Sequence, residues 1–99
     1  MILKEFSDDI KRVFDEYYPN QKKSDAVYDL AECFEEFVFA MTTDENELVA
    51  KCVGEVTISL SNLCDKMGIN YPESVDQCWR EFKSNAEKSK YADSMAANA

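Results

Sequence analysis

Apolar residues recur at three- and four-residue intervals along most of the chain, which is the spacing of amphipathic α-helices. The first helix is predicted from about Leu3 to Tyr18, and it ends at Pro19 and Asn20. The second begins near Ser24, a good N-cap, with Asp25 suited to the positive end of the helix dipole. Its apolar stripe consists of Val27, Leu30, Ala31, Phe34, Val38 and Met41.

Two more helices follow. Thr42 and Glu45 have the spacing of a capping box and predict the start of the third helix, which Gly68 ends. The fourth opens at residues 70–72, with a proline near its first helical position, and is expected to fray near Lys90. The stripe of the third helix consists of Val49, Cys52, Val53, Val56, Leu60, Leu63, Cys64 and Met67, and that of the fourth of Val75, Cys78, Trp79, Phe82 and Ala86.

Composition supports an all-α fold. Only two Gly and two Pro occur in 99 residues, whereas a sheet protein of this length needs many more turn residues. We therefore predict one four-helix domain over residues 1–90, followed by a flexible or loosely docked tail over residues 91–99. The helices carry more apolar stripes than one small core can use, so we expect faces of the first and fourth helices to be buried between chains.

Charge narrows the function classes. Eleven basic and twenty acidic residues give a net charge of −9, which opposes direct binding to a nucleic-acid backbone. Two interpretations of the acidic excess remain open. It is either a solvated helical surface or a cluster of carboxylates that holds a divalent cation.

The four cysteines have no CxxC spacing and the chain has no histidine, so a structural zinc site or a Cys-His nucleophile pair is not predicted. We interpret them as buried, reduced thiols. No N-terminal segment has the pattern of a secretion signal, and no apolar run approaches the roughly 20 residues of a membrane span. These patterns predict a cytoplasmic protein without membrane contact.

The second helix carries an acidic face that is unusual for a solvated surface. Four acidic residues fall within eight positions, where like charges repel: Asp29, Glu32, Glu35 and Glu36. On the third helix, Glu55 lies close to the apolar stripe, because it follows Cys52 by about one turn. An antiparallel pair of these helices can bring the carboxylates face to face, in an oxygen-lined site of the kind that Mg²⁺ favours.

Several segments, in their order and spacing, resemble the superfamily of MazG-like and phosphoribosyl-ATP pyrophosphohydrolase-like proteins. The resemblance covers about residues 27–90. It rests on Leu30-Ala31-Glu32-Cys33-Phe34-Glu35-Glu36-Phe37, on Cys52 to Glu55, on Leu63-Cys64-Asp65-Lys66-Met67-Gly68-Ile69-Asn70, and on Ser84-Asn85-Ala86-Glu87-Lys88, an ending found in phage-type members. It implies an all-α, four-helix MazG-like fold assembled as a homodimer or homotetramer, and Mg²⁺-dependent hydrolysis of a nucleoside triphosphate to the monophosphate and pyrophosphate.

The metal motif of the family is only half present. The family pattern is ExxE on one helix and ExxD on the next. Cys33 and Glu36 occupy the first pair of positions, and Cys52 and Glu55 the second. A thiol is a soft ligand that suits Mg²⁺ poorly. Glu36 and Glu55 are thus the expected metal ligands, and Cys33 and Cys52 are degenerate ligand positions.

Other residues receive roles from the same resemblance. Glu32 or Glu35 would act as a substitute ligand or general base, and Asn85 with Lys88 would contact substrate phosphates. An ordinary helix C-terminus explains Lys88 equally well, because the helix dipole favours Lys there. Trp79 and Phe82 are more typical of a core than of a base-stacking site.

Two functions therefore stay open. The first is a Mg²⁺-dependent nucleoside-triphosphate pyrophosphohydrolase. The second is a catalytically inactive MazG-like module, encoded by a phage or another mobile element and acting in the host cytoplasm, whose acidic surface docks on a basic protein partner.

Overall fold

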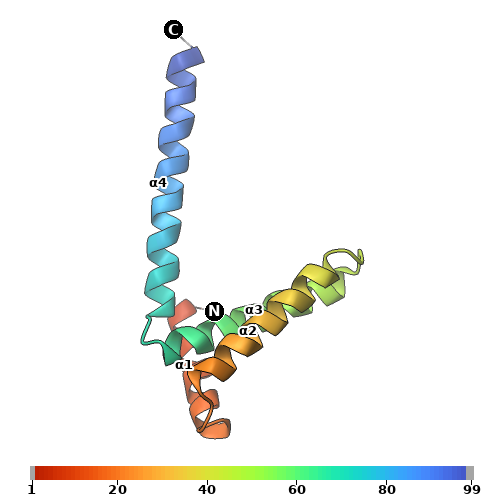
Figure 1. The fold of residues 1–99 in the computed structure, drawn as a ribbon. Helices are drawn as coiled ribbons and strands as arrows, with labels where there is room; N and C mark the ends of the chain where they lie inside the picture. Colours follow the sequence, from red (N-terminus) through yellow and green to blue (C-terminus); the bar gives the residue numbers. More distant parts are fainter. Residues whose placement is uncertain (1, 98–99) are drawn as a thin grey trace.

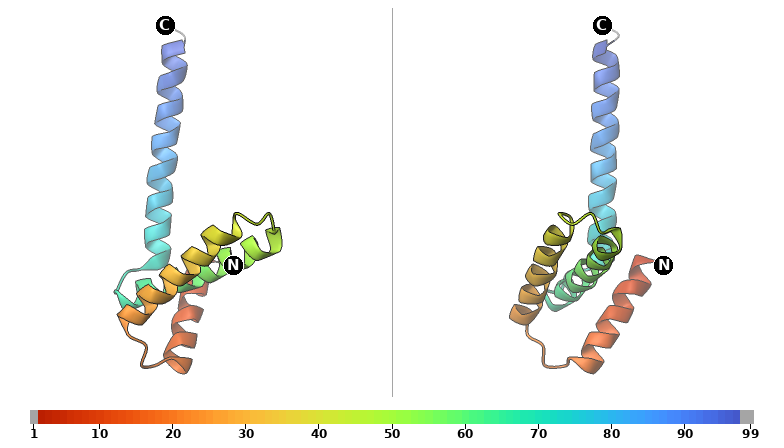
Figure 2. Two further views of the ribbon diagram at one scale, coloured as in Figure 1. Left: turned by 45° about the vertical axis from the view of Figure 1, so that its right-hand side comes forward. Right: turned by 90° about the vertical axis from the view of Figure 1, so that its right-hand side faces the viewer.

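The structure, a computed structural model, describes the backbone of residues 2–97 and the side chains of residues 2–90. This part of the chain forms four helices and no strand, as predicted: α1 (Leu3–Tyr17), α2 (Lys23–Ala40), α3 (Asn46–Lys66) and α4 (Tyr71–Ala97). Helices α2 and α3 form an antiparallel hairpin, α1 lies against the other side of α3, and α4 projects from the corner between α3 and α1 (Figures 1 and 2).

Helix α4 is longer than predicted. Its backbone stays helical past Lys90 to Ala97. The side chains of residues 91–97 and all of residues 98 and 99 lie outside the described part of the chain. The flexibility predicted for the tail over residues 91–99 therefore stays a prediction.

Two predicted helix caps are wrong. Helix α2 begins at Lys23, next to the predicted position, but its N-cap is Lys22 and not Ser24, and the Asp25 carboxylate accepts a hydrogen bond from the Lys22 backbone N–H at 2.9 Å. The capping box of Thr42 and Glu45 does not form. The Thr42 hydroxyl instead donates to the Phe39 carbonyl oxygen at 2.7 Å and so closes the end of α2.

The two boundaries around the corner between α3 and α4 are as predicted. Gly68 has a φ of +71°, and the N–H of Ile69 donates to the Cys64 carbonyl oxygen at 2.8 Å. This left-handed glycine with a bond across the last turn is a Schellman C-cap. Asn70 caps α4, since its side-chain oxygen accepts the Glu73 N–H at 3.1 Å.

The most buried apolar side chains of α2 and α3 are small. Ala26 and Ala40 of α2 are buried at its two ends, and Cys52 of α3 is 3% exposed. The Cys33 thiol lies 3.4 Å from the Ser59 hydroxyl across the contact between these helices. These side chains let the two helices approach closely, which leaves their larger apolar residues at the sides of the hairpin.

The predicted apolar stripe of α2 is therefore not a core stripe within one chain. Four of its members are between 44% and 56% exposed: Val27, Phe34, Val38 and Met41. On α3, Val53 and Leu60 are also exposed, as is Met67 directly after it. The periodicity located an apolar side on each of these helices, but no part of the chain that the structure describes covers these exposed residues.

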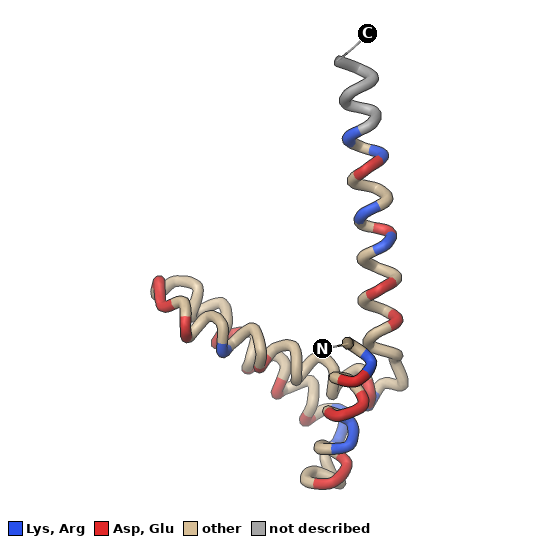
Figure 3. The backbone as a smooth tube through the Cα atoms, turned by 180° about the vertical axis from the view of Figure 1, so that it is seen from behind, with Lys and Arg blue, Asp and Glu red and all other residues tan. Residues whose placement is uncertain are grey.

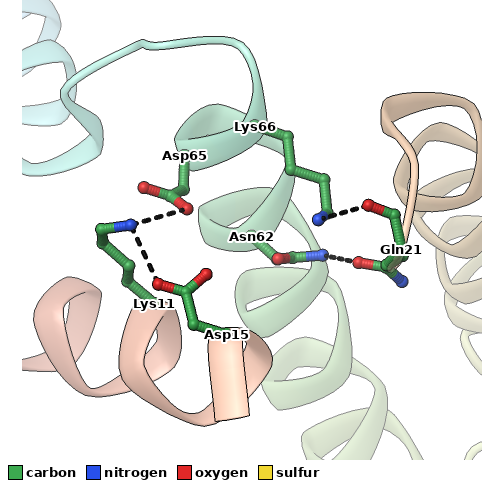
Figure 4. Close-up of polar contacts among 6 residues, drawn as sticks. All are labelled: Lys11, Asp15, Gln21, Asn62, Asp65 and Lys66. Carbon is green, nitrogen blue, oxygen red and sulfur yellow. Dashed lines mark hydrogen bonds and ion pairs between the residues drawn. The ribbon is translucent and has the colours of Figure 1, made fainter. Parts of the chain in front are cut away.

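Polar side chains tie α1 and the following loop to α3 (Figure 4). Asn62, which is buried, donates from its side-chain nitrogen to the Gln21 side-chain oxygen at 2.8 Å, and Lys66 donates to the Gln21 carbonyl oxygen at 2.9 Å. Lys11 of α1 lies 3.1 Å from Asp15 and 3.7 Å from Asp65. The hydrogen bond from Lys11 to Asp15, with the nearby Asp65 charge, raises the pKa of Lys11.

Among the described side chains of α4, those at its start pack within the chain and the later ones are exposed. Tyr71 is buried beside Phe6, with 6.5 Å between their ring centroids. Trp79 and Phe82 stack on each other at 6.0 Å but are 59% and 66% exposed, so the prediction that they are core residues is wrong for one chain. Cys78 is likewise exposed and not buried.

The projecting helix gives the chain an open, two-armed shape (Figure 1). Its radius of gyration is 17.9 Å, whereas a compact domain of this length has one of about 13 Å. One arm is the hairpin of α2 and α3, and the other is α4. The apolar faces of both arms are open to a partner.

Candidate functional site

The acidic side of the hairpin contains a pocket of about 470 Å³ between α2 and α3. Its apolar lining, which we call the floor, consists of Phe39, Leu48 and Cys52. Its polar lining, which we call the rim, consists of Glu32, Glu35, Glu36, Lys51 and Glu55. We call the pocket as a whole the acidic pocket.

The structure brings most of the predicted site residues together here. Glu32, Glu35 and Glu36 come from α2, and Cys52 and Glu55 from α3. This juxtaposition follows from the antiparallel pairing of two helices that each carry acidic residues beside the contact. Cys33 does not line the pocket, because it faces Ser59 within the contact between the helices.

Glu55 already has a partner. Its carboxylate oxygen lies 3.7 Å from the Lys51 ammonium, one helical turn away. The pair is largely exposed, so its contribution to stability is small. It nevertheless places a positive charge at the position where the family resemblance implies a metal ligand.

The Cys52 thiol is held in its protonated form. Burial raises its pKa, and the negative charges of Glu55 and Glu36 raise it further, against the opposite effect of Lys51. A protonated thiol is a poor metal ligand and a weak nucleophile. Cys52 therefore contributes apolar surface to the floor of the pocket.

The described side chains do not form a preassembled cage for the implied magnesium ion. Within the described side chains, no three His, Cys, Asp or Glu residues stand close enough together to hold a metal ion. Mg²⁺ requires near-octahedral oxygen coordination at about 2.0–2.1 Å. The pocket gathers negative charge around an opening, but it does not gather a set of ligands.

The predicted phosphate contacts lie elsewhere. Asn85 and Lys88 line a separate groove on α4, together with Arg80, Glu81 and Ser84. Helix α4 points away from the hairpin (Figure 1), so one chain does not bring these two residues to the acidic pocket.

Three members of the pocket were missed by the sequence analysis: Phe39, Leu48 and Lys51. Phe39 and Leu48 carry its apolar floor, and Phe39 is 68% exposed. Helical spacing contains the signal, since Phe39 follows Glu36 by three residues and Leu48 precedes Cys52 by four.

The charged residues divide unevenly between the two arms (Figure 3). Residues 23–66, which span the hairpin, contain three basic and ten acidic residues, for a net charge of −7. Residues 79–90 of α4 contain four basic and two acidic residues, for a net charge of +2. Over residues 71–90, α4 contains four basic and four acidic residues, so the hairpin is an acidic arm whereas α4 is neutral with a basic outer segment.

Comparison of the chain with models of known families, with curated proteins and with solved structures finds no match in any of the three. In the part of the chain that the structure describes, none of the helices combines the length and the apolar character needed to cross a bilayer.

Proposed function

We propose that this chain is a protein-interaction module of the MazG-like all-α type, whose acidic pocket binds a basic protein segment and does not hydrolyse nucleotides. One observation carries this proposal. The pocket collects carboxylates above an apolar floor, yet the described residues form no metal-binding group.

The chemistry of the pocket suits a basic, partly apolar peptide. Glu32, Glu35 and Glu36 have no ion-pair partner among the described side chains and are exposed. An incoming Lys or Arg would pair with these carboxylates, while an apolar side chain would cover Phe39. Carboxylates that no cation offsets repel the phosphates of a free nucleotide.

A titration with a short oligolysine tests this function, with binding measured by calorimetry at low salt. We expect binding that weakens in the Glu32→Gln/Glu36→Gln variant and is retained in a control with the same loss of charge on α1, Glu5→Gln/Asp9→Asn. Equal binding by both variants would show that oligolysine responds only to the net charge of the protein, and it would contradict specific binding in the acidic pocket.

The second candidate is the Mg²⁺-dependent pyrophosphohydrolase. Its support is that four carboxylates implied by the family resemblance do share one pocket. Incubation with Mg²⁺ and each common nucleoside triphosphate, followed by detection of pyrophosphate, separates the two functions. The module releases no pyrophosphate above the protein-free background, and catalytic release would overturn the proposed function.

A further inference from the structure

We propose that the basic segment that fills the acidic pocket is α4 of a second copy of this chain, whose lysines and aromatic residues neutralise and cover the pocket in place of a metal ion. This inference rests on the proposed function and specifies its partner.

The outer part of α4 has the surface that the pocket requires. Trp79 and Phe82 form an exposed stacked pair. Lys83 lies one turn beyond Trp79 and borders the aromatic pair, and Lys90 follows two turns beyond Phe82, farther out along the helix. Neither lysine has an ion-pair partner among the described side chains. Aromatic side chains with flanking lysines complement an apolar floor with a carboxylate rim.

The same chain does not close its own pocket. Helix α4 leaves the corner in a different direction from the hairpin, as both views of the ribbon show (Figure 2). Its described contacts are with α1 and with the end of α3. The basic surface and the acidic pocket therefore meet only between two copies.

The positions along the two arms match. At a rise of 1.5 Å per residue, Glu32 lies roughly 14 Å along α2 from the end of that helix at the corner, and Leu48 lies roughly 27 Å along α3 from its end at the corner. These two residues mark the near and far limits of the acidic pocket. The segment from Trp79 to Lys90 extends from roughly 12 to 28 Å along α4, measured from Tyr71.

This match points to a two-fold symmetric pair. A two-fold axis that bisects the hairpin and α4 exchanges the two arms, so α4 of each copy runs along the hairpin of the other, with the two corners adjacent. Each dimer then contains two identical contacts between a basic helix and an acidic pocket. The contact also reduces the repulsion between two chains of net charge −9.

Charge reversal in trans tests this arrangement. Variant one carries Lys83→Glu and Lys90→Glu, and variant two carries Glu32→Lys and Glu36→Lys. In a homodimer of either variant, charges of the same sign face each other at both contacts. We therefore expect its dimer dissociation constant to rise about tenfold or more above that of the wild type. An equimolar mixture has complementary charges at both contacts and should form a heterodimer. Sedimentation velocity at tens of micromolar and low salt measures all three samples.

One control variant and one further test variant complete the experiment. Lys88→Glu changes the same type of charge away from the aromatic pair and should leave dimerisation unchanged. Trp79→Ala should weaken dimerisation about tenfold or more, because a large anchor is lost. Circular dichroism confirms that each variant is helical, and recovery in the mixture shows that both single variants are folded.

The possible outcomes distinguish a failure of the dimer from a failure of the proposed peptide-binding function. A monomeric wild type, charge variants that dimerise like the wild type, or a mixture that stays monomeric would each overturn the second copy as the occupant. If the pocket of such a protein still binds oligolysine through Glu32 and Glu36, the proposed function stands. Catalytic pyrophosphate release would instead remove the function itself.

Discussion

Asn62 of α3 holds the loop between α1 and α2 through Gln21, whose side-chain oxygen accepts a hydrogen bond from the Asn62 amide at 2.8 Å. Asn62 is 3% exposed, so little water reaches its side chain. The contact joins residues 41 positions apart and fixes where the first helix ends relative to the hairpin.

This hydrogen bond should be measurable in the free energy of unfolding. We expect Asn62→Ala to lower it by about 1–2 kcal/mol, because the change removes a buried hydrogen bond and leaves the Gln21 oxygen without its donor. A double-mutant cycle with Gln21→Ala should show a coupling of roughly 0.5–1.5 kcal/mol. Gln77→Ala, in an exposed contact on α4, serves as the control and should change stability by less than about 0.5 kcal/mol. Strictly additive effects of Asn62 and Gln21 would contradict the link.

We expect Gly68 and Gly54 to respond in opposite directions to substitution by alanine. Gly68→Ala should lower the free energy of unfolding by roughly 1–2 kcal/mol, since its φ of +71° is unfavourable for any residue with a Cβ. Gly54→Ala, within α3, should raise it by roughly 0.5–1 kcal/mol, because alanine is the better helix former. No heavy atom lies within 4 Å of a Cβ added at either position. Chemical denaturation measures both, and changes of equal sign would contradict the assigned C-cap.

Much of the fold was predictable because its signals are local. Helical periodicity, Gly68 and Asn70 predicted the four helices and the corner between α3 and α4. The N-cap of α2 and the start of α3 were predicted wrongly, because the Asp25 carboxylate accepts the Lys22 N–H and the Thr42 hydroxyl donates to the Phe39 carbonyl oxygen. Such choices depend on the path of the chain between two helices, which periodicity does not describe.

Burial was the less predictable property. Trp79, Phe82 and Phe34 have the spacing of core residues, but they lie on faces that no other part of the described chain covers. A sequence pattern identifies an apolar face without identifying its partner. The pocket was predictable, because helical spacing indicated that Glu36 and Glu55 lie near each other. The lack of a metal-binding donor group among the described side chains became evident only from the structure.

The four thiols should react at different rates with an alkylating reagent. Cys78 is exposed and should react first, whereas Cys52 is buried and its pKa is raised. Because a raised pKa lowers the thiolate fraction at a given pH, Cys52 should react slowly at pH 8 and faster as the pH rises. Mass spectrometry of the labelled peptides measures each rate.

Removing a nearby negative charge should move the Cys52 pKa back toward its ordinary value. Glu36→Gln should therefore increase the alkylation rate of Cys52 at pH 8. Glu47→Gln is the matched control, because Glu47 lies on α3 outside the acidic pocket. An equal increase in both variants would show that Glu36 does not act on the thiol directly.

The central claim is that the acidic pocket docks a basic helix and is not a magnesium site. Calorimetric titration of the wild type with Mg²⁺ tests it most directly, beside a titration of the same protein with oligolysine as the positive control. We predict no saturable Mg²⁺ binding and saturable oligolysine binding, because the pocket offers no preassembled set of metal ligands, whereas its carboxylates attract a basic chain. Saturable Mg²⁺ binding by the wild type would contradict the account.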